Sequence, residues 1–266
     1  MPRGLVGFRR VVANTFDSDA QAFITAAGIT DTTQKTAINT LVTSLKSYSI
    51  WTKMKAIYPF VGGTASSHKF NLKDPRDLDA AYRLTFTAGW VHSSTGALPN
   101  GSSDYADTYL LANLVESTNH LSYYSRTELV NTECEMGIYI SGIPKVFQLR
   151  LAANYVAGSG TIPSNGRVLF TTITDARGFW LGSKRSNIDR AAYFNGTSQG
   201  TSTLIDTTTS GAFKYYIGAR NDDGAPYLFS TKQTAFASIG DGLTDTEASN
   251  FYTAVQTYQT SLNRQV

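Results

Sequence analysis

The last fifty residues constrain the fold of this chain most strongly. Residues 213–219 alternate, with Phe213, Tyr215 and Ile217 on one face, and the polar turn 221–224 follows them. A second apolar run spans residues 234–239. Thr244 and Glu247 then form a Ser/Thr-x-x-Glu capping box, which opens an amphipathic helix. The segment therefore predicts two strands of an antiparallel sheet and a terminal helix.

The preceding part of the chain repeats the strand pattern many times. Tyr82 to Trp90 alternate with a period of two, and Asn195-Gly196 has the composition of a tight hairpin turn. Short strands joined by polar turns are typical of a sandwich. We expect strands at 82–90, 120–126, 133–140, 145–153, 167–173, 178–183, 190–195, 213–219 and 234–239.

The region before residue 81 has a different, helical pattern. Ser18 with Gln21 and Asp31 with Gln34 predict two helix starts. One apolar stripe follows the second start, formed by Ile38, Leu41, Val42 and Leu45. A hairpin this small must pack on the following domain or on copies of itself. The expected organisation is an arm at 1–16, a helical hairpin and connector at 17–80, and a sandwich at 81–266.

Composition excludes several classes of partner. The net charge of +3 is too small, and the basic residues too scattered, to indicate nucleic acid. No apolar stretch is long enough to span a bilayer, and the N-terminus lacks the pattern of a signal peptide. The one cysteine, Cys134, excludes an intramolecular disulfide and is expected to be a buried thiol.

Several segments, in order, resemble the laminin-G/concanavalin A-like superfamily. They are GFWLG at 178–182, AYFNG at 192–196, FKYYIGAR at 213–220 and GDGLTDTEASNFYTAV at 240–255. The resemblance implies a mainly β, concanavalin A-like antiparallel sandwich or jelly roll, with a small N-terminal helical hairpin and a C-terminal helix. Joined to residues 17–84, the pattern is similar to virion proteins of phages infecting Bacteroidota, and this likeness covers residues 17–262.

That family implies a structural, host-facing role and supplies no catalytic residues. The expectation is a virion protein, such as a spike, head fibre or tail appendage, that is not an enzyme. Residues 1–50 would contact other virion proteins, and a homotrimer is favoured because such appendages commonly project along symmetry axes. A purely architectural capsid decoration protein is one alternative, and a glycan depolymerase is another.

Glycan binding would use exposed aromatic rings and polar side chains near turns. The candidates for binding a host surface polysaccharide are Trp180, Tyr193, Arg220, Asn221 and Tyr227. Trp180 lies in an apolar strand, so a core position is the alternative for it.

Catalysis or metal binding would need clustered acids. Glu133 and Glu135 share a face but lack the remaining acids of a Glu-x-Asp-x-x-Glu pattern, so a solvated strand face is the default. No cofactor is expected, except that Asn221, Asp222 and Asp223 could hold Ca²⁺ in an oxygen-rich turn. The same residues also stabilise turns without a metal. His68, His92 and His120 are isolated in the sequence and are expected to be structural or exposed.

Overall fold

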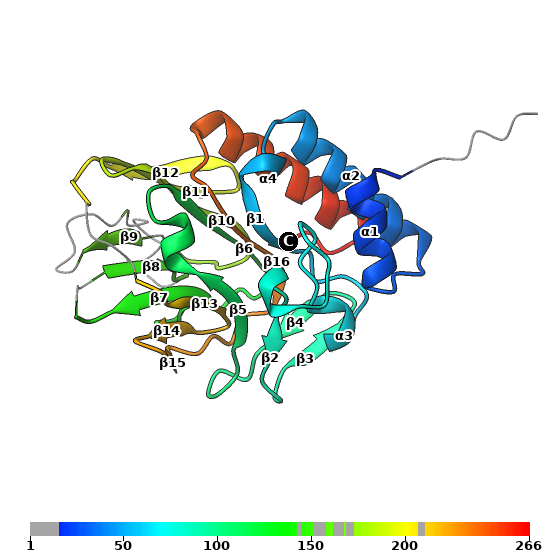
Figure 1. Ribbon diagram of the computed structural model, residues 1–266, viewed down its shortest axis with the longest axis horizontal. Helices are drawn as coiled ribbons and strands as arrows, with labels where there is room; N and C mark the ends of the chain where they lie inside the picture. The colour runs from blue at the N-terminus through cyan, green and yellow to red at the C-terminus, as the bar shows by residue number, and fades with distance from the viewer. Residues whose placement is uncertain (1–15, 143–144, 152–157, 162–167, 169–172, 207–210) are drawn as a thin grey trace, which may run out of the picture.

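A computed structural model describes residues 16–142, 145–151, 158–161, 168, 173–206 and 211–266. Within these residues two β-sheets pack face to face, and three helices cover one of them (Figure 1). The predicted mainly β, concanavalin A-like sandwich with an N-terminal helical hairpin and a C-terminal helix is confirmed. The predicted arm lies outside the described residues, apart from residue 16.

The sheet beneath the helices is called the covered sheet. Its order is β12-β11-β10-β6-β16-β4-β3, and β1 also pairs with β16. Every pairing in it is antiparallel, as the sequence predicts. Its strands are β1 (Met54–Tyr58), β3 (Val91–Ser93), β4 (Gly96–Leu98), β6 (Asn119–Ser125), β10 (Gly178–Ser186), β11 (Asp189–Phe194), β12 (Thr197–Ser202) and β16 (Thr234–Gly240).

The other sheet is called the open sheet. Its order is β15-β14-β7-β13-β5-β2, and β8 pairs with both β7 and β9. One pairing departs from the predicted antiparallel sheet, because β14 runs parallel to β7. Its strands are β2 (Thr85–Phe86), β5 (Ala106–Leu111), β7 (Met136–Ile140), β8 (Lys145–Leu149), β9 (Gly158–Thr161), β13 (Lys214–Ile217), β14 (Arg220–Asp222) and β15 (Ala225–Tyr227).

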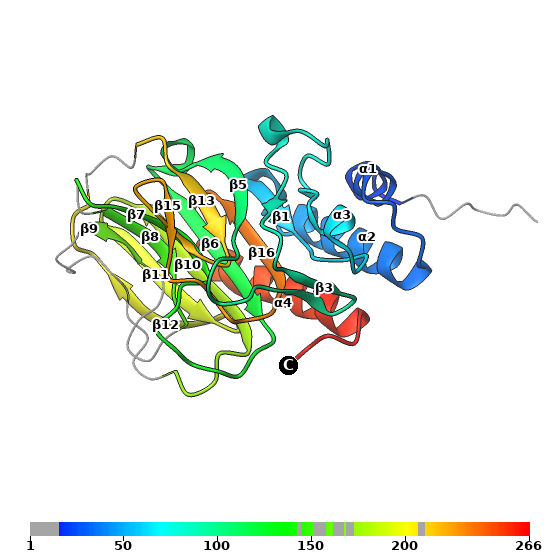
Figure 2. The same ribbon diagram turned by 90° about the horizontal axis from the view of Figure 1, so that it is seen from below.

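The helices form one layer rather than a separate projection. Helix α4 (Asp245–Ser261) lies on the covered sheet, α2 (Thr32–Ser47) packs on α4, and α1 (Ser18–Ala26) packs on α2. Figure 2 shows α1 and α2 gathered towards one end of the sandwich, with β9, β11 and β12 at the other. The hairpin thus buries its apolar stripe against the domain that follows it. The short helices are η1 (Trp51–Lys53), α3 (Ala65–His68), η2 (Asp79–Ala81) and η3 (Ala112–Val115).

Alternation along β10 explains how one strand serves two cores. Phe179 and Leu181 point to the helices, whereas Trp180 points into the space between the sheets. The two faces of a strand alternate with a period of two, so each core receives every second side chain. The covered sheet is therefore buried on both sides.

Several local predictions are confirmed. Thr244 and Glu247 form the capping box of α4, and Asp31 caps α2 by accepting a hydrogen bond from the Gln34 amide. Asn195 and Gly196 both have positive φ between β11 and β12, as a primed hairpin turn requires. The four residues of the α2 stripe are all buried.

Two local predictions are wrong. Asp17, rather than Ser18, caps α1, and its carboxylate also pairs with Lys46 at 2.7 Å. The predicted strand 82–90 is reduced to the two residues of β2. Tyr82 takes a left-handed conformation at the end of η2, and the Gly89 amide donates to Asp104, so the backbone turns at both ends of the alternating run. The predicted strand at 167–173 lies mostly outside the described residues.

Candidate functional site

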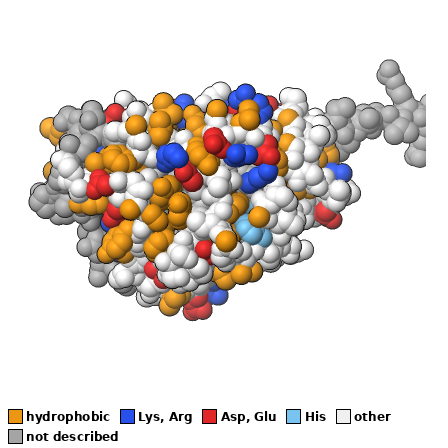
Figure 3. Space-filling model, turned by 60° about the horizontal axis from the view of Figure 1, so that its bottom comes forward, with side chains coloured by type: hydrophobic (Ala, Val, Ile, Leu, Met, Phe, Trp, Pro, Cys, Tyr) orange, Lys and Arg blue, Asp and Glu red, His pale blue; other side chains and the backbone are white. Residues whose placement is uncertain are grey.

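The outer side of the open sheet carries a group of tyrosines. On β7 and β13 the inward positions are apolar, among them Ile138, Tyr215 and Ile217, so alternation directs the intervening side chains outward. Figure 3 brings this side forward and shows hydrophobic side chains gathered on it, with charged side chains among them. We call this group the tyrosine face. It consists of Tyr105, Tyr109, Tyr139, Tyr216 and Tyr227.

Strand register places two of these tyrosines, Tyr216 and Tyr227, in one row across the sheet. Tyr227 pairs with Arg220, which pairs with Gly137 on β7. Gly137 also pairs with Tyr216 on β13, and Tyr216 pairs with Asp107 on β5. Residues in register across a sheet share a face. Side chains from β5, β13, β14 and β15 are thereby brought together from positions more than a hundred residues apart.

Arg220 lies between two rings of the tyrosine face. Its guanidinium lies 4.8 Å from the Tyr139 ring centroid and 5.8 Å from that of Tyr227. It donates to both carboxylate oxygens of Asp222, at 2.5 and 2.7 Å, and to Gln148 Oε1 at 3.1 Å. Burial alone would lower the pKa of Arg220, but its bonds with Asp222 raise it. The bidentate pair fixes the plane of the guanidinium between two aromatic rings.

A second charged pair lies beside Tyr109 and Tyr216. Lys214 Nζ is 2.8 Å from Asp107 Oδ2 and 4.4 Å from the Tyr109 ring centroid. The ring of Tyr105 packs on that of Tyr216, with centroids 4.5 Å apart. Hydrogen bonding to Asp107 raises the pKa of Lys214. Both cations of the face are therefore paired and positioned before any ligand binds.

This arrangement suits a ligand with flat apolar faces and many hydroxyl groups. Partly exposed tyrosine rings offer apolar surface together with a polar tip, at a low cost in side-chain entropy. The charged pairs beside them offer fixed hydrogen-bond donors and acceptors. A sugar ring, with its C–H face and its hydroxyl rim, matches both features.

Two of the candidates from the sequence meet on this face. Tyr227 is 55% exposed and lies beside Arg220. Their neighbour Asn221 is buried instead, and its amide donates to the Lys214 carbonyl at 2.8 Å. Its Oδ1 accepts from the Gly224 amide, so Asn221 holds the turn between β14 and β15.

The other two candidates lie elsewhere. Trp180 is only 3% exposed, stacks on Phe194 in the core between the sheets and donates to the Ala176 carbonyl. The core alternative for Trp180 therefore describes its position. Tyr193 is buried on the opposite side of the covered sheet, where its hydroxyl donates to Asp245 in the first turn of α4. The structure brings neither residue to the tyrosine face.

Sequence reasoning missed most of the tyrosine face. Tyr139 and Tyr216 occupy the outward positions of β7 and β13, which lie within two strands predicted from the sequence. The outward positions of a solvated strand normally carry small or charged residues. A tyrosine at such a position was therefore the signal that could have revealed this face. Tyr105 and Tyr109 have no such signal, because Tyr105 precedes its strand and Tyr109 has a positive φ within it.

The acids at 133 and 135 are not on a solvated face, so that prediction is wrong. Glu135 and Lys232 are both 0% exposed, with Glu135 Oε1 and Lys232 Nζ 3.0 Å apart. Glu133 accepts from the amide and hydroxyl of Thr231 and lies 3.5 Å from the same Lys232. A buried carboxylate needs such partners because the interior replaces its hydration poorly. Cys134 between them is a buried free thiol, as predicted.

The acidic turn at 221–223 is built from bonds within the protein. Asp222 pairs with Arg220, and Asp223 accepts from the Ser141 amide at 3.1 Å. In the part of the chain that the structure describes, no group of three or more His, Cys, Asp or Glu residues is placed to hold a metal ion. The Ca²⁺ hypothesis remains a prediction.

The three histidines are structural in different ways. His68 and His92 meet with their Nδ1 atoms 2.9 Å apart, although they are isolated in the sequence. Burial lowers the pKa of His68 to about 3. His120 is buried between β6 and α4, and burial lowers its pKa to about 4.

No helix among the described residues is long and apolar enough to cross a membrane.

Comparison with known proteins gives structural neighbours only. No family model and no curated protein matches this chain. A mutant of Trypanosoma rangeli sialidase displaying trans-sialidase activity is 11% identical, with a TM-score of 0.50, over 83% of this chain and 39% of that one. Domain 4 of AbnA, a GH43 extracellular arabinanase from Geobacillus stearothermophilus, is 18% identical, with a TM-score of 0.46, over 75% of this chain and 98% of that one. A receptor binding domain is 9% identical, with a TM-score of 0.43, over 66% and 47% of the two chains.

The sialidase neighbour corrects one prediction. The chain is similar to part of a sialidase, spanning 39% of its length, and this likeness shows the β-sandwich fold. The prediction that the protein is not an enzyme rested on a family resemblance that supplies no catalytic residues and on the incomplete acid pattern at Glu133 and Glu135. The likeness to a sialidase contradicts that prediction.

Proposed function

We propose that this protein is a glycan-binding β-sandwich whose tyrosine face binds a surface polysaccharide. The observation that carries the proposal is the cluster on the open sheet in which Asp222 fixes Arg220 between Tyr139 and Tyr227. An aromatic cluster with preset charged pairs binds without much loss of side-chain freedom, which favours affinity. The sialidase neighbour supports the proposal in a general way, because its name is that of a glycan-acting protein.

The biological setting is the finer part of the proposal. The resemblance of residues 17–262 to phage virion proteins supports an outward-facing spike, fibre or tail component. In that setting the open sheet would face the host, and residues 1–50 would make the contacts with other virion proteins. The apolar stripe of α2 is already buried within the chain, so those contacts would use the arm and the exposed sides of α1 and α2.

A second candidate function is cleavage of the bound glycan. The specific observation in its favour is that the first neighbour named above is a sialidase mutant with trans-sialidase activity. On the tyrosine face, Asp107 is in register with Tyr216 and Asp222 is in register with Tyr139, so these two carboxylates would be the candidate acids beside a bound sugar. Both are paired with cations, so cleavage would require one of these pairs to open.

The test is retention of the purified full chain on a panel of immobilised bacterial surface polysaccharides. We expect retention of the wild-type protein on at least one polysaccharide and a clear loss of retention for Tyr227→Ala. Ile188→Ala is the matched control, because Ile188 is 55% exposed and lies in the turn between β10 and β11 of the covered sheet. Equal retention of both variants, or no retention of the wild type on any polysaccharide, would contradict the proposal. The second outcome would favour an architectural role.

The same samples separate binding from cleavage. Reducing ends are measured in the supernatant with and without the protein. New reducing ends that disappear in Asp222→Asn or Asp107→Asn would establish the second candidate and place its chemistry on the tyrosine face. New ends that persist in both variants would place the chemistry elsewhere.

A further inference from the structure

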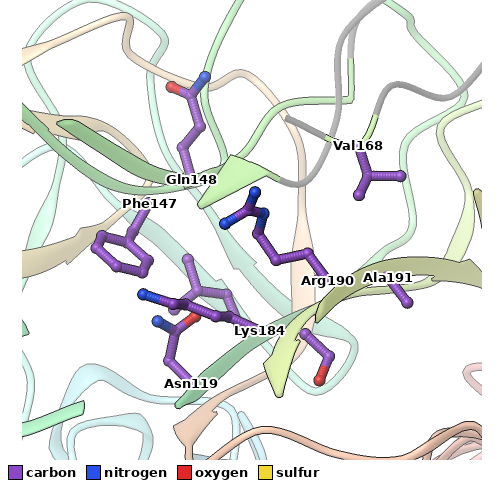
Figure 4. Close-up of a pocket in the computed structure, with 10 residues that line it drawn as sticks. Asn119, Phe147, Gln148, Val168, Lys184, Arg190 and Ala191 are labelled. Atoms are coloured by element: carbon purple, nitrogen blue, oxygen red, sulfur yellow. The ribbon is translucent and has the colours of Figure 1, made fainter. Parts of the chain in front are cut away.

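A small cavity lies between the two sheets, away from the tyrosine face. Its volume is about 20 Å³, and Lys184 and Arg190 line it together with Asn119, Phe147 and Ser183. Figure 4 shows Arg190 and Lys184 extending from their strands into this space, whereas the Gln148 side chain points away from it. By this measure a cavity of 10–15 Å³ already holds one water molecule, so this one accepts a single water-sized or slightly larger occupant.

The side chains around the cavity carry surplus positive charge. Lys145, Lys184 and Arg190 are each at most 2% exposed. The carboxylates paired with them are those of Asp206, 3.4 Å from Lys184 and 3.8 Å from Arg190, and Glu116, 3.5 Å from Lys145. Three cations thus share two carboxylates, and the Glu116 side chain is partly exposed.

No acid outside the described residues can balance this charge. Every Asp and Glu of the sequence falls within the described ranges. One further acid, Asp189, contributes to the electrostatic surroundings of Arg190, but it is paired with Arg185 at 2.5 Å. An unbalanced charge is costly in an interior of low dielectric. The surplus must be met by a bound anion or by loss of a proton from a lysine.

Arg190 favours the bound anion. Its terminal nitrogens donate to the Leu204 and Asn187 carbonyls, but its buried Nε–H has no partner among the described residues. An arginine stays charged in a protein, so this donor cannot be removed by titration. A neutral lysine would remove the surplus charge and leave the Nε–H unpaired, and a water would pair the Nε–H and leave the charge. One anion satisfies both.

We propose that this cavity binds a single small inorganic anion of the halide class, held by Arg190 and Lys184. Its size excludes phosphate, sulfate and the carboxylate of a larger ligand. The anion would join β10 and β11 of the covered sheet to β8 of the open sheet, because Lys145 on β8 supplies part of the charge that attracts it. The site would stabilise the sandwich.

The first experiment compares thermal unfolding of the full chain in sodium chloride, sodium bromide and sodium gluconate at equal ionic strength. Binding to the folded state alone raises the melting temperature, by roughly 5 °C when halide is about 100-fold above its dissociation constant. We expect this rise in chloride and bromide and a saturable dependence on their concentration. Equal melting temperatures in all three salts would overturn the proposal.

Two variants test the source of the effect. Lys145→Met removes the surplus charge without lining the cavity, and Lys184→Met removes a proposed ligand. Both variants are expected to lose the halide-dependent rise in melting temperature. The control, Lys35→Met on the surface of α2, should keep this rise. If Lys145→Met or Lys184→Met folds, as judged by circular dichroism, and still shows the full rise, the assignment is wrong. If neither folds, the crystallographic experiment decides.

That experiment uses crystals of the wild-type protein grown with bromide. An anomalous peak in contact with Arg190 Nε and Lys184 Nζ is expected. If the peak is present but halide does not raise the melting temperature in solution, the anion binds at crystal concentration only. That result would contradict a stabilising site. A water, or no density, at this position would overturn the proposal.

Discussion

The outer sides of the two sheets differ in a way that separates folding from binding. The covered sheet turns Phe179, Leu181 and Phe236 outward and buries them under α4. The open sheet turns tyrosines and paired charges outward, and these remain partly exposed, except that Tyr216 is buried. The same alternation thus yields a second core on one side and a surface for a ligand on the other. Changes on the covered side should affect stability, and changes on the open side should affect binding.

The largest effect is expected on the covered side. Phe251 of α4 is completely buried, with its ring 5.2 Å from that of Phe179 and 5.9 Å from that of Phe236. Phe251→Ala should lower the free energy of unfolding by about 3–5 kcal/mol, because it leaves a cavity between helix and sheet. Urea unfolding measures the change. Tyr227→Ala is the control from the open side and should change the same free energy by less than about 0.5 kcal/mol. A comparable loss in both variants would remove the distinction between the two sides.

The next largest effect is a dependence of stability on pH that comes from the covered side. His120 Nδ1 lies 2.7 Å from the Asp241 carbonyl and its Nε2 lies 3.0 Å from Ser238 Oγ, a pattern that fits a neutral ring. Its pKa is lowered by burial to about 4 in the folded protein, against 6.5 for an ordinary histidine. Unfolding therefore takes up a proton, and the contribution is fully present above pH 6.5 and is lost as pH falls towards 4.

Urea unfolding at pH 7.5, 6.5, 5.5 and 5.0 tests this effect. His120 should contribute a slope approaching about 1.4 kcal/mol per pH unit below pH 6. His68, whose pKa is also lowered by burial, contributes with the same sign. His120→Gln should flatten part of the slope relative to wild type. An unchanged slope in that variant would show that His120 is not buried in its neutral form.

A smaller effect is expected in binding on the open side. Tyr139→Ala removes one of the two rings that flank Arg220, at 4.8 Å from its guanidinium. The variant should weaken polysaccharide binding about tenfold, equivalent to about 1.4 kcal/mol, as is usual for an aromatic contact near the centre of an interface. Titration followed by intrinsic fluorescence measures it. Tyr48→Ala on the helical side is the control and should leave polysaccharide binding unchanged. If Tyr48→Ala weakened binding and Tyr139→Ala did not, the binding surface would lie on the helical side, contrary to the proposal.

The smallest effect concerns the start of α4. Thr244→Ala removes the side chain that accepts from the Glu247 amide and should cost about 1 kcal/mol of unfolding free energy. Polysaccharide binding should be unchanged, because the cap lies on the covered side. Thermal unfolding and the retention assay on the same variant check both statements. Reduced retention would indicate that α4 and the open sheet are coupled.

The sequence predicted those elements whose signals are local. The capping box at Thr244, the Asn195-Gly196 turn and the α2 stripe each act within a few residues, and each is present in the structure. The run from Tyr82 to Trp90 shows the limit, because its alternation coexists with turns fixed by distant partners such as Asp104. Alternation also assigns side chains to faces without saying which face is solvated.

The candidate site depended on contacts that local signals do not carry. Glu135 and Lys232 are almost a hundred residues apart, so neither position alone indicates a buried ion pair. The tyrosine face requires the register of β5, β13, β7 and β14, including the parallel pairing of β14 with β7. Tyr227 and Arg220 could be proposed because a single turn joins them, whereas Tyr105 and Tyr109 could not.

Hydrogen exchange of the full chain, with and without saturating polysaccharide, tests the central claim most directly. The account predicts slower exchange of backbone amides in β7, β13, β14 and β15, and no change in α1, α2 or α4. Protection confined to the helices, with none on these four strands, would contradict it, because the glycan would then bind on the covered side.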